Sequence, residues 1–321
     1  MFFTQVDGFI VCTNYVNCSI IIWELIFLKK ALIILMCFVL MYMLAYALDK
    51  TVIVNNENLN IVTSFYPIYI ATLNVTDGVS GVNVTNLTNN TTGCLHDYTL
   101  TTEQMVSLSS CDVFVINGAG MESFIDNVIS NYSKLNIIDS SKDLKLLKDK
   151  EDDEINSHTF ASVSNYIIQV KTIAKQLGKI DSKNEEKYIE NADNYILELE
   201  QLEKSIKENT VNVDNKNIVT FHESFEYFAE EFGLNVLCVI EEEHGKMPSA
   251  KEIADITKKI KENNVKAIFV EPDSSLKLAQ AIAKETGAKI YTLNPVTTGD
   301  DKKTAYVDIM NENVKVLKEA L

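Results

Sequence analysis

The sequence predicts an α/β protein built as two lobes, each a parallel sheet covered by helices, with one long rigid helix joining them. Two observations lead to this fold class. Short runs rich in β-branched residues alternate with runs of helical periodicity from about residue 58 to the C-terminus, which is the pattern of parallel sheets covered by helices. A long helical run without glycine or proline divides these elements into two groups, so we expect a cleft between two lobes.

The first lobe is expected over residues 55–181. Its strands are predicted where valine, isoleucine, threonine and aromatic residues cluster, at Asn60–Ser64, Val82–Leu87, Asp112–Asn117 and Leu135–Asp139. Apolar residues recur at helical spacing over 102–110, 120–132 and 160–178. These helical runs follow the second, third and fourth predicted strands of this lobe.

The connecting helix is expected over residues 182–209, and the second lobe over 210–321. The connector, SKNEEKYIENADNYILELEQLEKSIKEN, repeats apolar residues at intervals of three or four, as on the buried face of an amphipathic helix. At about 1.5 Å per residue it is roughly 40 Å long, which favours a rigid connector. The later strands are predicted at Asn217–Phe221, Asn235–Ile240, Ala267–Val270 and Lys289–Leu293, and the later helices at 223–232, 249–263, 274–287 and 303–320.

Residues 1–47 are expected to be an export signal or a membrane anchor. Lys29 and Lys30 precede the apolar run ALIILMCFVLMYMLAYA, which ends in Ala45-Tyr46-Ala47, and this order is typical of a secretory signal with its cleavage site. The run is also close to the length that spans a bilayer, so a retained anchor stays open. In either case the rest of the chain is predicted to lie outside the cytoplasm, at a bacterial cell surface or secreted.

Charge and cysteine content exclude several classes of protein. The net charge is -16 and the chain contains no arginine, so nucleic-acid phosphates would repel it and no nucleic-acid partner is expected. Three of the six cysteines lie in the N-terminal apolar region, and the other three, Cys94, Cys111 and Cys238, form no CxxC pair. The sequence therefore predicts no disulfide framework.

Three of the four histidines lie where strands end or helices begin. His222 directly follows a predicted strand, His96 lies in the loop after another, and His158 precedes a helix. Ligands of open α/β sheets bind beyond the carboxyl ends of the strands, and neutral imidazole is the commonest zinc ligand. Each histidine by itself also fits a capping or core role. Together they predict a metal site drawn from both lobes, whereas His244 is expected in a surface loop.

Longer segments of the sequence resemble a known family. NIVTSFYPIYIATLNV, GCLHDYTLTTEQMVSLSSCDVFVINGAG, NSHTFASVSNYIIQVKTIAKQL, VTFHESFEYFAEEFGL and KAIFVEPDSSLKLAQAIAKETGAKIYTLNPV occur in this order. They are similar to segments of the cluster A-I substrate-binding proteins, the zinc and manganese receptors of ABC importers. The resemblance runs from about residue 58 to the C-terminus. It implies two Rossmann-like lobes joined by a backbone helix, with a metal site in the cleft between them.

The resemblance also implies the ligands. Carried over by position, they are His96, His158 and His222, and imidazole at position 222 favours Zn²⁺ over Mn²⁺. A carboxylate that some members carry after LNP is absent here, where the sequence reads NPVTTGDD. Glu271, Asp300 or water is then expected as the fourth ligand. Cys94 is not expected to contribute, because two side chains at positions i and i+2 of such a loop rarely both point inward.

The expected function is that of an extracytoplasmic, monomeric zinc receptor that delivers the ion to the membrane subunit of an ABC permease. A manganese receptor of the same family is the first alternative. A metal-dependent hydrolase is the second, with Glu223 as the base, although its helical position is expected to turn it away from the site. A surface adhesin that uses the fold only as a module is the third. No catalytic residue is predicted.

Overall fold

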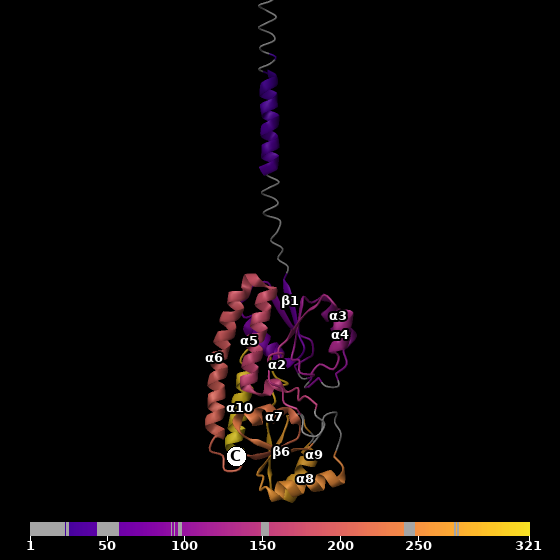
Figure 1. The fold of residues 1–321 in the computed structure, drawn as a ribbon, viewed down its shortest axis with the longest axis vertical. Helices are drawn as coiled ribbons and strands as arrows, with labels where there is room; N and C mark the ends of the chain where they lie inside the picture. Colours follow the sequence, from indigo (N-terminus) through magenta and orange to yellow (C-terminus); the bar gives the residue numbers. More distant parts are fainter. Residues whose placement is uncertain are drawn as a thin grey trace, which may run out of the picture. The chain divides into compact units, whose positions relative to one another are not determined.

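The computed structural model describes residues 23, 26–43, 58–90, 92, 94–95, 98–148, 154–240, 248–272, 274 and 276–321. The chain forms two compact units, Met1–Glu57 and Asn58–Leu321. Apart from residues 55–57, both predicted lobes and the connecting helix fall in the second unit, whose helices and strands are labelled in Figure 1.

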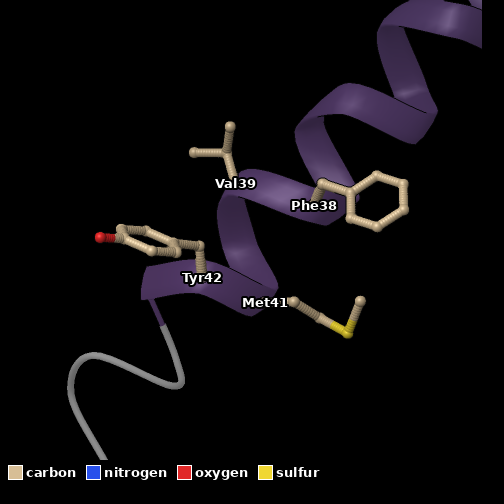
Figure 2. A pocket seen from close by; sticks show the side chains of 4 residues that line it. All are labelled: Phe38, Val39, Met41 and Tyr42. Atoms are coloured by element: carbon tan, nitrogen blue, oxygen red, sulfur yellow. The ribbon is translucent and has the colours of Figure 1, made fainter.

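In the first unit, an apolar helix covers Ile26–Met43. Its 18 residues have a mean hydropathy of 2.2 and none of the helix is buried. It is long and apolar enough to cross a membrane, and a signal sequence has the same properties. Figure 2 shows Phe38, Val39, Met41 and Tyr42 around a shallow hollow at the end of this helix. These side chains are suited to contact with lipid, so the hollow is no sign of a ligand site.

The first lobe contains a four-stranded parallel sheet in the order β2-β1-β3-β4. Its strands are β1 (Leu59–Thr63), β2 (Val82–Asn86), β3 (Val113–Ile116) and β4 (Asn136–Asp139), and its helices are α2 (Tyr66–Val75), α3 (Thr102–Ser110), α4 (Ile125–Asn131) and α5 (Val163–Ile180). The strand order reverses direction between β1 and β3, and side chains at the carboxyl ends of neighbouring strands converge at such a point.

The second lobe repeats this topology in a parallel sheet of order β6-β5-β7-β8. Its strands are β5 (Asn217–Thr220), β6 (Asn235–Val239), β7 (Ala267–Val270) and β8 (Lys289–Thr292), and its helices are α7 (Glu226–Phe232), α8 (Ala250–Glu262), α9 (Leu276–Thr286) and α10 (Ala305–Ala320). All eight predicted strands are confirmed within one residue at each end. The predicted α/β class with two parallel sheets is therefore confirmed.

The predicted long helix is α6, Glu185–Thr210, with 26 residues. It starts three residues later than expected because Ser182–Asn184 forms a turn of 3-10 helix. Its buried face consists of the apolar residues that predicted it, and it packs against α5 and α10, as Figure 1 shows. At about 1.5 Å per residue α6 is about 39 Å long, so one straight element supports both lobes.

Two helices differ most from the prediction. The helix expected over 120–132 begins only at Ile125, because Gly118, Ala119 and Gly120 have positive φ angles of 78°, 54° and 87°, and L-residues do not continue a right-handed helix from that region. Helix α2 was not predicted. Most of its ten residues are buried, and a helix that is apolar on all sides has no periodic pattern to detect.

One hydrophobic core extends through both lobes, and a second, smaller cluster belongs to the second lobe alone. Tyr166 of α5 stacks on Tyr306 of α10 with ring centroids 3.7 Å apart, and the Tyr306 hydroxyl donates to the Phe160 carbonyl at 2.9 Å. Residues of both sheets belong to the same buried cluster. Because this core unites Asn58–Leu321, the lobe boundaries 55–181, 182–209 and 210–321 remain a prediction.

Candidate metal centre

His222 is held at the carboxyl end of β5. The backbone N–H of Phe221 donates to the Phe269 carbonyl at 2.9 Å, which extends the pairing of β5 with β7 by one residue. His222 follows in an extended conformation, with φ -125° and ψ 157°, just before a 3-10 turn over Glu223–Phe225. Its side chain is partly exposed. The end of the strand therefore presents the imidazole beyond the sheet, where a ligand can reach it.

His158 lies on the side of the first lobe and is fully buried. Asn156 Oδ1 accepts the backbone N–H of His158 at 2.9 Å and lies 3.1 Å from its Nδ1. Because an amide oxygen only accepts, this contact assigns the proton to Nδ1 and leaves the Nε2 lone pair open to a metal or another donor. Cys94 Sγ lies 3.3 Å from that Nε2.

The ligand atoms of Cys94, His158 and His222 all lie within 4.8 Å of one another. The rings of His158 and His222 are nearly perpendicular, at 88°, with centroids 4.8 Å apart. Two histidines that are distant in the sequence therefore come together from the two lobes. His96 and His244 lie outside the described residues, so the part of His96 in the site remains a prediction.

The expectation that Cys94 points away from the site is wrong. Its neighbour Leu95 is fully buried in the core, and the Leu95 backbone N–H lies 3.5 Å from Met121 Sδ. Adjacent side chains in a non-helical segment tend to point in opposite directions, so the burial of Leu95 directs Cys94 toward His158. The signal in the sequence for Cys94 was its position two residues before the candidate ligand His96.

Glu271 directly follows β7, yet it is not in the group of atoms that lie within 4.8 Å of one another. Its carboxylate Oε1 accepts the hydroxyl of Ser224 at 2.5 Å, and its backbone N–H donates to Ser274 Oγ. Its role as a metal ligand therefore remains a prediction. The exposed Asp300 carboxylate is bound by Lys302 at 2.5 Å, and this hydrogen bond lowers the pKa of Asp300.

Glu223 does not turn away from the site as expected. Its Oε1 lies 3.7 Å from His158 Nδ1, on the side of the ring opposite the nitrogen that faces Cys94. A carboxylate there orients the imidazole and increases its basicity. This contact is on the Nδ1 side of His158, which is the position of a group that orients a ligand.

Polar contacts connect the His158 segment to both lobes. Asn117, at the carboxyl end of β3, donates from Nδ2 to the Ser157 carbonyl at 2.9 Å, and Thr159 Oγ1 donates to Asn117 Oδ1 at 3.1 Å. On the second lobe, Asn156 Nδ2 donates to the Glu223 carbonyl at 3.1 Å, and the Tyr227 hydroxyl donates to the Asn156 carbonyl at 2.9 Å. The position of His158 is therefore set by groups from both sheets.

A buried carboxylate completes this end of the first sheet. Glu122 is only 2 % exposed and accepts the backbone N–H groups of Asn117 and Gly118 at 2.8 and 3.0 Å. Burial raises the pKa of Glu122 to about 7, although these N–H groups limit the rise. Because both its oxygens accept these hydrogen bonds, Glu122 acts here as a brace for the loop after β3.

Comparisons with known proteins agree with this architecture. A family model described as zinc-uptake complex component A, periplasmic, matches residues 61–320. The high-affinity zinc uptake system protein ZnuA of Bacillus subtilis is 28 % identical over 284 residues, covering 83 % of this chain and 88 % of that protein. The manganese-binding lipoprotein MntA of Halalkalibacterium halodurans is 25 % identical over 232 residues, covering 70 % of this chain and 77 % of that protein.

A solved structure extends the agreement to three dimensions. The laminin-binding protein Lmb of Streptococcus agalactiae, described as a bifunctional protein with adhesin and metal-transporting activity, has a TM-score of 0.75 and 29 % sequence identity, covering 82 % of this chain and 99 % of that chain. The family match spans nearly all of the compact unit Asn58–Leu321, which has the two parallel sheets and the long helix. The chain therefore belongs to the zinc-uptake complex component A family of extracytoplasmic metal-binding proteins.

Proposed function

We propose that this protein is a zinc receptor that captures Zn²⁺ with His96, His158 and His222 and delivers it to the membrane subunit of an ABC permease. One observation carries the proposal: the ligand atoms of His158 and His222, which come from different lobes, lie within 4.8 Å of each other and of Cys94. Proteins of this family work with ABC permeases. The apolar helix Ile26–Met43 is suited to export or to holding the receptor at the membrane.

The donor atoms favour zinc over manganese. Imidazole nitrogen suits Zn²⁺, whereas Mn²⁺ prefers carboxylate, carbonyl and water oxygen. In the described part of the site, two imidazoles lie close together, and the group of ligand atoms within 4.8 Å of one another contains no carboxylate. A manganese receptor remains the alternative, since a manganese-binding lipoprotein is among the relatives.

Receptor function requires no catalytic base, and the family is one of binding proteins. A hydrolase would need a carboxylate directed at a metal-bound water. Glu223 instead approaches the Nδ1 side of His158, which is the position of a group that orients a ligand. The adhesin alternative is compatible with a metal site, because Lmb is described as having both activities.

Isothermal titration of the full chain in detergent with Zn²⁺ tests the proposal. Replacing His222 by alanine removes a direct ligand. Loss of a group that only orients a ligand lowers metal affinity by up to roughly 100-fold. We expect loss of a direct ligand to lower the zinc affinity by more than that. His244→Ala is the matched control and should bind zinc like the wild type. Unchanged zinc affinity in His222→Ala would contradict the receptor assignment.

A further inference from the structure

We infer that Cys94 is a direct ligand of the captured ion through its thiolate sulfur, so that the centre is a mixed nitrogen and sulfur site. This inference rests on the proposed function, because it concerns the same ion. It assigns the fourth position to Cys94 instead of Glu271, Asp300 or water. The Cys94, His158 and His222 side chains are the group of metal-ligating side chains that the described part of the chain brings together.

The spacing of the donor atoms fits coordination. With Zn–S near 2.3 Å and Zn–N near 2.0–2.1 Å, a tetrahedral ion separates its sulfur and nitrogen ligands by about 3.6 Å. Cys94 Sγ and His158 Nε2 are 3.3 Å apart, so a shift of a few tenths of an ångström would admit the ion between them.

The orientation of His158 supports the same conclusion. Asn156 Oδ1 holds Nδ1 as a donor, so Nε2 presents its lone pair toward the sulfur. Without metal, the Cys94 S–H donates to this nitrogen. When Zn²⁺ arrives, the S–H bond breaks, the proton passes to solvent, and sulfur and nitrogen each direct a lone pair at the ion.

The competing fourth ligand, Glu271, lies outside the group of ligand atoms that are within 4.8 Å of one another. Its Oε1 accepts a short hydrogen bond from Ser224 Oγ, at 2.5 Å. Cys94 belongs to that group, and its sulfur faces Nε2 of His158 at 3.3 Å.

The other two cysteines of the second unit differ from Cys94. Cys111 Sγ donates to the Leu108 carbonyl at 3.4 Å, and burial raises the pKa of its thiol to about 11. Burial also raises the pKa of Cys238 to about 11. Neither belongs to the group of ligand atoms. They are therefore matched controls for the loss of a half-buried thiol.

A thiolate ligand changes which ions the site selects. Soft sulfur favours Zn²⁺, and still more Cd²⁺ and Cu⁺, over Mn²⁺. Losing the sulfur should therefore lower the affinity for Cd²⁺ most, that for Zn²⁺ less, and that for Mn²⁺ hardly at all. Replacing Glu271 would give the reverse order if its carboxylate were the ligand.

Cobalt substitution provides the direct test. The full chain in detergent is loaded with Co²⁺, and a near-ultraviolet sulfur-to-cobalt charge-transfer band is expected for the wild type. Cys94→Ser should lose the band while still binding Co²⁺ through its imidazoles. Cys111→Ser, Cys238→Ser, Glu271→Gln and a triple variant with serine at positions 12, 18 and 37 should keep it.

Metal competition gives the second readout. In Cys94→Ser we expect zinc affinity to fall by at least ~10-fold and cadmium affinity by more, with manganese unchanged. A wild type that binds Co²⁺ and Zn²⁺ without the sulfur band would overturn the assignment of Cys94 and leave the receptor function standing. A wild type that binds neither ion would overturn both. Because the band is read on the wild type, poor folding of a variant does not block the test.

Discussion

At the scale of single residues, Asn156 makes two contacts that orient His158. Asn156 Oδ1 accepts the backbone N–H of His158 and faces its Nδ1, while Asn156 Nδ2 donates to the second lobe at Glu223 and Glu226. The same side chain thus selects the tautomer of a ligand and connects two segments. Hydrogen-bond partners of a ligating imidazole fix its tautomer and ring orientation and so affect its affinity for a metal.

Replacing Asn156 by alanine should lower zinc affinity by roughly 10–100-fold, because the His158 ring loses the acceptor that orients it. Asn156→Asp keeps an oxygen at that position but loses the amide donor beside Glu226. We expect it to bind zinc more tightly than Asn156→Ala while melting at a lower temperature than the wild type. Titration and thermal unfolding measure the two effects. If zinc affinity fell in parallel with melting temperature in both variants, Asn156 would have only a structural role.

The residues of the site were predictable to different degrees. His222 was predictable, because a strand rich in β-branched residues ends directly before it and ligands bind at carboxyl ends. His158 was predicted as a ligand that precedes a helix, but its full burial was not evident. Cys94 and Glu223 were misjudged, since side-chain direction in a loop depends on which neighbour enters the core. For Cys94 that neighbour is Leu95.

At the scale of elements, α6 shows how periodicity predicts both a helix and its buried face. Tyr188, Tyr195, Leu199, Leu202 and Ile206 recur at helical spacing, and all are buried. The apolar periodicity can be read from the sequence because the opposite face of α6 is exposed to water. Helix α2 lacks such a contrast and was missed, since it packs against α5 and α6 as well as β1.

Two leucines of α6 allow a matched test of this face. Leu199 is fully buried, whereas Leu197 is 58 % exposed. Leu199→Ala should lower the free energy of unfolding by about 2–5 kcal/mol, because it leaves a cavity in the shared core. Leu197→Ala should change it by about 0.5 kcal/mol at most. Chemical denaturation measures both. Equal effects would show that α6 is not packed as described.

At the scale of the whole molecule, the lobes are joined by more than a linker. The Tyr166 and Tyr306 rings stack between α5 and α10, and the Tyr66 hydroxyl donates to the Asp300 carbonyl at 2.7 Å. Helix α6 adds a straight support along the same side. A large hinge motion would have to expose this buried core, at a cost of roughly 25 cal/mol for each Å² of apolar surface.

We therefore expect zinc to change the overall dimensions of the protein very little. Small-angle X-ray scattering of the protein with and without Zn²⁺ should give the same radius of gyration within error. Release to the permease would then require movement of the loops that carry the ligands rather than opening of the lobes. A clear contraction on adding zinc would contradict this, and would indicate a hinge that the shared core does not allow.

The sequence by itself determined the two parallel sheets, the long helix and the strand-end position of His222. These features depend on local periodicity and on the alternation of parallel strands with helices. Both can be read from short stretches of the chain. Only the tertiary structure decided that His158 and His222 meet, that Cys94 faces them, and that the lobes share one core. Those outcomes depend on packing between residues distant in the chain, where burial of a neighbour such as Leu95 determines the direction of a side chain.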